Sequence, residues 1–257
     1  MPLDGLHGDR DRAESFGSVA ERYDRYRPGY PDRLIDDVLV LRPRRAVDVG
    51  CGTGKVAVQL MQRGVRVLGV EPDTRMADLA RGHGVQVEQA TFEKWAPAGR
   101  TFDLLTAGHS WHWVDPAVGL RKAAAVLELG GTIALFWNYH VVERPLLEAL
   151  EHVYGVHAPG LAIVGRDPRG LPDIDPFEAS PDFCSVQTRT YRWRRVLDAD
   201  QWAGLLGTFS DHIALGHARL TALQQAVRAV IADSGGFVRS QCGTYLWLAC
   251  RGGKPSN

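Results

Sequence analysis

Two hydrophobic patterns alternate along the first half of this chain. Short apolar runs, typical of buried strands, lie at Ala46–Val49, Arg66–Val70, Val85–Glu88, Phe102–Ala107 and Thr132–Trp137. Stretches with helical spacing of apolar residues lie between them, over Lys55–Arg63, 73–82 and Pro116–Leu127. Strands that alternate with helices predict parallel βαβ units. The pattern therefore predicts an α/β fold with a doubly wound, mostly parallel sheet and helices on both faces.

The chain before this core is helical in pattern. Apolar residues at helical spacing predict helices over Phe16–Tyr26 and Asp32–Leu41, separated by Pro28 and Pro31. We therefore expect residues 1–45 to form an N-terminal helical cap and residues 46–257 to form the main domain.

The regular alternation breaks after Asn138. Residues 138–182 contain one predicted helix, Pro145–Tyr154, and then a stretch rich in Gly, Pro and Asp, which is typical of an inserted lid or substrate region. The remaining predicted elements are a strand at Val186–Trp193, a helix at Ala199–Leu206, a helix around 220–231 and a strand at Thr244–Cys250.

Residues 47–54 read Val-Asp-Val-Gly-Cys-Gly-Thr-Gly, directly after the first predicted strand. Glycines at alternate positions allow a tight turn and the close approach of a ligand to the main chain. The second strand ends at Glu71-Pro72, where a carboxylate can accept hydrogen bonds from the two hydroxyls of a ribose. These features predict a site for a nucleoside-containing cofactor.

The glycine spacing distinguishes between cofactors. The dinucleotide fingerprint Gly-x-Gly-x-x-Gly needs a glycine at position 55, where this chain has Lys55, which argues against a nicotinamide-dependent dehydrogenase. The pattern from Asp48 to Gly54 instead resembles the first motif of the class I S-adenosylmethionine-dependent methyltransferases. The resemblance implies that S-adenosylmethionine is the cofactor, and that Asp48 orients the loop or reaches the methionine amino group.

Three further segments extend the resemblance. Ala90–Glu93 is similar to the family's second acidic motif, which flanks the adenine. His112-Trp113-x-Asp115 resembles the aromatic-His-Trp-x-Asp motif of the type-11 small-molecule methyltransferases, including relatives of trans-aconitate methyltransferase. Residues 16–31 resemble the segment that caps the cofactor in this subgroup. The resemblance also implies a seven-stranded, Rossmann-like sheet that ends in an antiparallel hairpin.

These motifs define three sets of candidate residues. The cofactor-binding set is Asp48, Gly50, Cys51, Gly52, Gly54, Glu71, Pro72, Met76, Phe92, Glu93, Ala107 and Arg27. The substrate set is Tyr23, Tyr30, Trp111, Trp113 and Trp137. His109 and His112 are the candidate general bases. Structural roles are the alternatives: Phe92 and Trp113 as core residues, and Arg27 as a surface arginine.

Composition narrows the class of protein. The formal net charge is zero, with 45% hydrophobic and 23% charged residues, which is ordinary for a globular protein and argues against a nucleic-acid substrate. The four cysteines show no metal-binding spacing, so we expect no metal site. The chain has no predicted signal peptide or membrane-spanning stretch, and its cysteines fit a reducing compartment, so a cytoplasmic enzyme is expected. The excess of arginine over lysine, together with abundant alanine, indicates a bacterial source.

We therefore expect methyl transfer to a small molecule by in-line displacement. A carboxylate acceptor needs no base, whereas a phenol, enol or amine needs one. The alternatives are methylation of RNA or protein, and a non-catalytic S-adenosylmethionine-binding regulator. The sequence leaves open the identity of the acceptor, the methylated atom and the oligomeric state.

Overall fold

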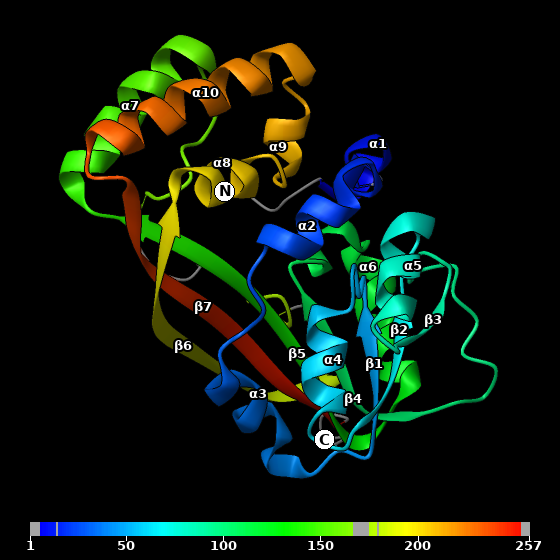
Figure 1. The fold of residues 1–257 in the computed structure, drawn as a ribbon. Helices are drawn as coiled ribbons and strands as arrows, with labels where there is room; N and C mark the ends of the chain where they lie inside the picture. Colours follow the sequence, from blue (N-terminus) through cyan, green and yellow to red (C-terminus); the bar gives the residue numbers. More distant parts are fainter. Residues whose placement is uncertain (1–5, 14, 167–174, 179, 253–257) are drawn as a thin grey trace.

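The computed structural model describes residues 6–13, 15–166, 175–178 and 180–252. Its centre is a seven-stranded sheet in the order β3-β2-β1-β4-β5-β7-β6 (Figure 1). The strands are β1 Arg45–Val49, β2 Arg66–Val70, β3 Gln86–Glu88, β4 Phe102–Gly108, β5 Leu127–Val142, β6 Phe183–Asp198 and β7 Phe237–Arg251. The first five strands pair in parallel, and β7 is antiparallel to both β5 and β6. The predicted fold class is confirmed.

Side chains alternate between the two faces of the sheet along each strand, and both faces are apolar. Helices therefore cover both faces. Ala46 of β1 packs in one apolar cluster with Leu34 of α3 (Asp32–Val38) and Leu60 of α4 (Lys55–Met61). Val47, the next residue of β1, packs on the opposite face with Ala123 of α6 (Pro116–Val126). The third helix of the first half, α5 (Thr74–Gly82), connects β2 to β3.

Strands β5, β6 and β7 are much longer than their sequence patterns predict. Polar residues such as Asn138 and His140 interrupt the apolar run, yet β5 stays paired with β7 as far as Val142. Residues 138–142 of the predicted insertion therefore continue β5. Residues 167–174 and 179 of that insertion lie outside the described residues.

The long ends of these strands carry a second layer, built from helices (Figure 1). Its helices are α7 Arg144–His157, α8 Ala199–Leu206, α9 Ser210–Ile213 and α10 His217–Asp233. Trp202 of α8 is fully buried there, in a cluster that includes Leu150 of α7 and Leu223 of α10. We call these four helices the helical layer. It is formed by two chain segments, one on each side of β6.

The N-terminal segment connects the two layers (Figure 1). The described part of the predicted cap begins with η1 (Leu6–Gly8) and α1 (Arg10–Ala13); residues 1–5 and 14 lie outside it. The predicted helix over 16–26 is split into η2 (Ser15–Val19) and α2 (Ala20–Tyr26). Lys55 of α4 donates to the main-chain oxygen of Asp24 at 2.7 Å, and the Tyr26 ring lies against Gly204 of α8. A short 3-10 turn, η3 (Leu39–Leu41), ends the predicted helix over 32–41.

Candidate active site

The loop after β1 has the left-handed backbone that its glycines predict. Gly50, Gly52 and Gly54 have φ values of 61°, 57° and 86°, a region in which L residues with side chains are strained. A Cβ atom on Gly50 would lie 2.5 Å from Cβ of Ser110, in the segment after β4. The loop therefore passes directly against the carboxyl end of the neighbouring strand.

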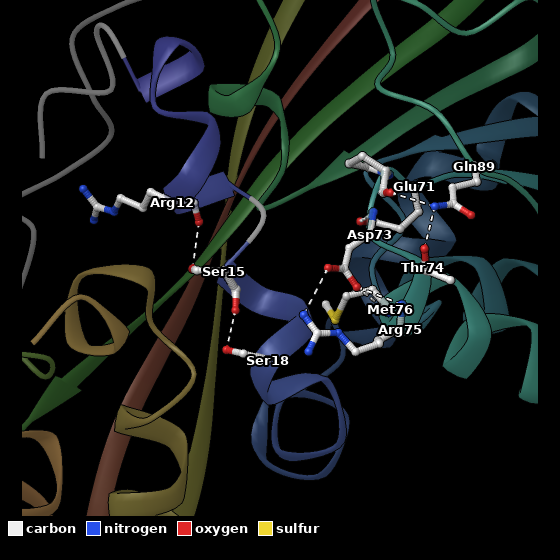
Figure 2. A network of polar contacts seen from close by, with 10 residues as sticks. Arg12, Ser15, Ser18, Glu71, Asp73, Thr74, Arg75, Met76 and Gln89 are labelled. Atoms are coloured by element: carbon white, nitrogen blue, oxygen red, sulfur yellow. Dashed lines mark hydrogen bonds and ion pairs between the residues drawn. The ribbon is translucent and has the colours of Figure 1, made fainter. Parts of the chain in front are cut away.

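Glu71 ties the end of β2 to this loop. Its Oε2 accepts a hydrogen bond from the amide of Gly52 at 2.9 Å, and its Oε1 accepts one from the amide of Asp73 at 3.0 Å. Burial raises the pKa of Glu71 to about 7, although the hydrogen bonds from these two amides partly oppose the shift. Asp73 in turn caps α5, accepting from the amides of Arg75 and Met76 (Figure 2).

Asp48 is the second buried carboxylate of the site. Its Oδ1 accepts a hydrogen bond from the Thr106 hydroxyl at 2.7 Å, while its Oδ2 is buried without a hydrogen-bond partner. Burial, together with the charge of Glu71, raises the pKa of Asp48 to about 7. A buried acceptor atom of this kind is costly unless a donor reaches it. Asp48 therefore suits a ligand that brings a positively charged donor.

Two cavities meet at the glycine loop. The smaller one, of about 90 Å³, lies beside Glu71, and the larger one, of about 580 Å³, extends from Asp48 to the helical layer. Both cavities are lined by Tyr23, Gly50, Gly52, Gly108 and His109. Carboxyl ends of parallel strands are the usual ligand-binding edge of a doubly wound sheet. The arrangement places the Glu71 carboxylate in the smaller cavity and the Asp48 carboxylate in the larger one, on either side of the glycine loop.

Most of the residues predicted from the sequence line these cavities. Those in the smaller cavity alone are Glu71, Pro72, Met76, Phe92, Glu93 and Trp113. Those in the larger cavity alone are Arg27, Tyr30, Asp48 and Cys51. The structure does not bring Gly54, Ala107, Trp111, His112 or Trp137 to the lining of either cavity.

Packing explains why these residues lie elsewhere. Ala107 of β4 is fully buried in the apolar core. Trp111 packs against Phe92, with ring centroids 6.0 Å apart. Trp137 makes an edge-to-face contact with Trp247 at 5.3 Å. A Cβ on Gly54 would lie 3.2 Å from Cβ of Ala80, so this glycine permits close helix packing.

The two candidate bases both use their acceptor nitrogen inside the protein. Nε2 of His109 accepts from the amide of Asn138 at 2.7 Å, and Nδ1 of His112 accepts from the Trp137 indole at 3.1 Å. A neutral imidazole has one acceptor nitrogen. Burial lowers the pKa of His112 to about 4 and that of His109 well below its ordinary value, so both rings are neutral. Neither ring therefore offers a free lone pair.

Phe92 and Glu93 combine the predicted and the structural roles. Phe92 lines the smaller cavity, but its ring also packs against Trp95 at 6.1 Å. The Glu93 carboxylate lines the same cavity and accepts from the amide of Asp115 at 2.9 Å, which fixes the start of α6.

Arg27 is not a surface arginine. Its guanidinium donates to the hydroxyl and the main-chain oxygen of Thr208 at 2.8 and 2.9 Å, and it lies 3.8 Å from the centre of the Phe209 ring. Burial lowers its pKa, but the charge of Asp211 acts in the opposite direction. Arg27 therefore brings a positive charge to the larger cavity.

No motif of the sequence indicates the far wall of the larger cavity. This wall is formed by α7, the chain after it and the start of α9, with side chains that include Tyr154, Leu161, Ile163, Phe209 and Asp211. They lie far from the glycine loop in sequence and match no motif of the first half. Only the long strand ends bring them to the site.

Within residues 6–13, 15–166, 175–178 and 180–252, no group of three His, Cys, Asp or Glu side chains is placed to hold a metal ion. None of the described helices is long and apolar enough to cross a membrane.

Comparison with known proteins gives the same picture. Residues 47–135 match the type-11 family described as a methyltransferase domain. An uncharacterized methyltransferase of Mycobacterium tuberculosis is 32% identical over 225 residues, which is 87% of this chain and 88% of that protein. A trans-aconitate 2-methyltransferase of Rhodopseudomonas palustris is 35% identical over 107 residues, 40% of this chain and 41% of that enzyme.

The fold is also similar to solved structures. One from Anaeromyxobacter dehalogenans, described as a type II methyltransferase, has a TM-score of 0.63 with 21% identity, over 87% of this chain and 97% of that one. The similarity over nearly the whole length shows that the chain belongs to the class I S-adenosylmethionine-dependent methyltransferases of the type-11 family and uses S-adenosylmethionine as its cofactor.

Proposed function

We propose that the protein methylates a small, partly apolar molecule held in the larger cavity. The observation that supports this proposal is the lining of that cavity. Apolar side chains such as Leu161, Ile163 and Phe209 line it beside the charged Arg27 and Asp211. Apolar walls with a few convergent polar groups are typical of small-molecule sites. A net charge of zero also disfavours a nucleic acid as the partner.

The residues present fit the cofactor. The unpartnered Oδ2 of Asp48 suits the ammonium of the methionine end, and the Glu71 carboxylate suits the ribose hydroxyls. Arg27 supplies a cation for a carboxylate, either that of the methionine end or that of the acceptor. Phe92 and Glu93 flank the place proposed for the adenine.

S-adenosylmethionine brings a methyl group already activated by its sulfonium, so the protein mainly has to align the reactants. Gly108 lets the chain pass closely at the junction of the cavities, since a Cβ there would lie 2.5 Å from the Tyr30 hydroxyl. Tyr23 and His109 border both cavities, where the acceptor and the methyl group are proposed to meet. Such positioning supplies about 7–11 kcal/mol in favourable cases.

The experiment is incubation with methyl-labelled S-adenosylmethionine and a metabolite extract of the host cells. We expect label in the low-mass fraction, followed by identification of the product by mass spectrometry. Label found only in RNA or protein would contradict the proposal and favour a macromolecular acceptor. Cofactor binding without transfer to any fraction would favour a non-catalytic regulator.

A further inference from the structure

Three side chains in the helical layer form a hydrogen-bonded chain that ends at the larger cavity. The Tyr154 hydroxyl lies 2.7 Å from Nε2 of His212, and Nδ1 of His212 lies 2.7 Å from Oδ1 of Asp211. Tyr154 comes from α7, while Asp211 and His212 come from α9. Tyr154 and Asp211 both line the larger cavity. We call Tyr154, His212 and Asp211 the relay.

Chemistry fixes the direction of these hydrogen bonds. Burial acts to raise the pKa of Asp211, but the hydrogen bonds that it accepts from the side chain and main chain of His212 lower it, so Asp211 is an ionised acceptor. A carboxylate only accepts, so Nδ1 of His212 carries the hydrogen, and in that tautomer Nε2 is the acceptor. The Tyr154 hydroxyl donates to Nε2. The amide of Val164 donates to the Tyr154 oxygen from the other side.

The relay is protected from water. His212 is fully buried, and Tyr154 is 4% exposed. Burial raises the pKa of Tyr154, with the hydrogen bond from Val164 opposing it. A phenol in this setting does not ionise alone, but it passes a proton to a partner that already holds its hydrogen bond. The same pattern, an acceptor nitrogen backed by a carboxylate on the other ring nitrogen, orients a catalytic imidazole.

The site has no free base among the histidines that the sequence singled out. His109 and His112 each use their acceptor nitrogen on an internal donor. His140, which also lines the larger cavity, has a pKa lowered by burial to about 3 and shares its Nδ1 with Ser240 and Cys242. Of the side chains named in this subsection, only Tyr154 is hydrogen-bonded to an imidazole whose other ring nitrogen binds a carboxylate.

We propose that the methyl acceptor is a hydroxyl group and that Tyr154, backed by His212 and Asp211, removes its proton. This inference rests on the proposed function and specifies its substrate class. An acceptor that is already a carboxylate needs no such relay, since it is ionised at neutral pH.

The proton and electron movements balance within the site. The acceptor O–H bond breaks, and its proton bonds to the Tyr154 oxygen while the Tyr154 proton moves to Nε2 of His212. The electron pair left on the acceptor oxygen forms the bond to the transferred methyl, and sulfur keeps the pair of the broken S–C bond. The His212 imidazolium is paired with Asp211 and returns its proton through Tyr154 once the product has left. Tyr154 is the catalytic residue, and His212 and Asp211 position and support it.

The charges around the relay favour this direction. Arg27 of the larger cavity and Arg12 of α1 both act on Asp211, and Arg12 also donates to the Ser210 hydroxyl at 2.9 Å. Glu151, one turn before Tyr154, lines the same cavity. The charge of Arg12 adds to the hydrogen bonds from His212 in keeping Asp211 ionised, and the ionised Asp211 stabilises the imidazolium that forms on His212.

The experiment uses the full-length protein, methyl-labelled S-adenosylmethionine and the host metabolite extract. Tyr154→Phe and His212→Gln are compared with Tyr191→Phe and His152→Gln. The Tyr191 hydroxyl binds Asp37 away from the cavities, and His152 is exposed on α7. Glutamine at position 212 can donate to Asp211 and accept from Tyr154, but it cannot take up a proton. The His212→Gln variant can therefore keep the hydrogen bonds of the relay while it removes the uptake of a proton.

We expect kcat to fall about a hundredfold in Tyr154→Phe and His212→Gln, with an unchanged KM for the cofactor. The two control variants should keep the wild-type rate. We also expect the label in products that resist dilute alkali, as ethers do. Wild-type kcat in Tyr154→Phe, or label in alkali-labile methyl esters, would overturn the relay while leaving small-molecule methylation intact. Label confined to RNA or protein would instead overturn the proposed function.

A second measurement needs no turnover. 4-Nitrophenol, whose phenolate absorbs visible light, serves as the hydroxyl probe in the presence of S-adenosylhomocysteine at pH 7. We expect a larger phenolate absorbance with the wild-type protein than with His212→Gln, because only the wild type takes up the proton. Equal absorbance with both proteins would overturn the relay.

Discussion

At the residue scale, two buried carboxylates dominate the part of the site proposed to bind the cofactor. Asp48 and Glu71 come from the ends of neighbouring parallel strands, and burial raises the pKa of each to about 7. Each is held by one or two internal donors and faces a cavity. Their ionised forms are therefore costly until donors of the cofactor arrive.

Glu71→Ala should weaken the binding of S-adenosylhomocysteine at least about tenfold, because hydrogen bonds to a charged group are lost. Isothermal titration calorimetry measures the change. Glu128→Ala is the control, since Glu128 pairs with Arg45 at the opposite end of the sheet. Unchanged affinity in Glu71→Ala would remove this carboxylate from the cofactor site.

The same carboxylates predict a pH dependence of cofactor binding. Ligand donors favour the ionised forms, so their pKa values fall in the complex and binding releases protons near pH 7. For one group with a pKa of about 7, the affinity for S-adenosylhomocysteine should rise about tenfold from pH 6 to pH 8. Calorimetry in two buffers of different ionisation enthalpy counts the released protons. An affinity that is constant over this range, in both the wild type and Glu71→Gln, would contradict the prediction.

At the element scale, α2 determines how the sheet and the helical layer meet. It carries Tyr23, which borders both cavities, and it packs against α8 at Gly204. A Cβ at Gly204 would lie 2.5 Å from the Tyr26 ring, so the contact depends on this glycine. The position of α2 therefore controls the junction of the two cavities.

Gly204→Ala should displace α2 and lower the free energy of unfolding by about 1–3 kcal/mol through overpacking. It should also weaken cofactor binding, because Tyr23 moves with the helix. Gly82→Ala, in α5, is the matched control, since nothing lies within 4 Å of a Cβ built there. Urea unfolding and calorimetry test both effects. If the two variants behave alike, the α2–α8 contact has no such role.

Elements that depend on local pattern could be predicted from the sequence, and those that depend on distant pairing could not. The strand before the glycine loop and the helix after it are confirmed within one or two residues. Strand β5 was predicted to end near Trp137 because Asn138 and His140 are polar, yet pairing with β7 extends it to Val142. The local periodicity of β5 does not indicate how far it pairs with β7, which lies about a hundred residues later in the chain.

The site divides in the same way. The cofactor residues follow motifs within the first half of the chain, and most of them line the cavities. The relay could not be found from the sequence, because Tyr154 and His212 are 58 positions apart and match no motif. The His112-Trp113 motif predicts a catalytic role for His112, but the lone pair on its Nδ1 accepts the hydrogen bond from the Trp137 indole. Its catalytic role remains a prediction without support from the geometry.

At the scale of the whole molecule, the described residues form three apolar clusters, one on each face of the sheet and one inside the helical layer. The cluster in the helical layer surrounds Trp202, which is fully buried. The larger cavity takes its lining from both the sheet side and the helical layer. The far wall of this cavity therefore depends on the packing of the helical layer.

Trp202→Ala should lower the free energy of unfolding by about 3–5 kcal/mol, as expected for a buried tryptophan. The control is Phe237→Ala, since Phe237 is 50% exposed. Denaturant unfolding followed by circular dichroism measures the difference. A loss no larger than that of Phe237→Ala would mean that the helical layer does not depend on this side chain.

The long strands β5, β6 and β7 have a consequence for how such enzymes diversify. One end of these strands completes the seven-stranded sheet, and the other end carries the helical layer, which forms part of the wall of the larger cavity. A chimera that exchanges the helices at 144–157 and 199–233 for those of a relative should change which molecule is modified while keeping the methyl donor. Under the proposed function, a new acceptor can be gained by exchange of the helical layer, while the glycine loop and its two carboxylates stay unchanged.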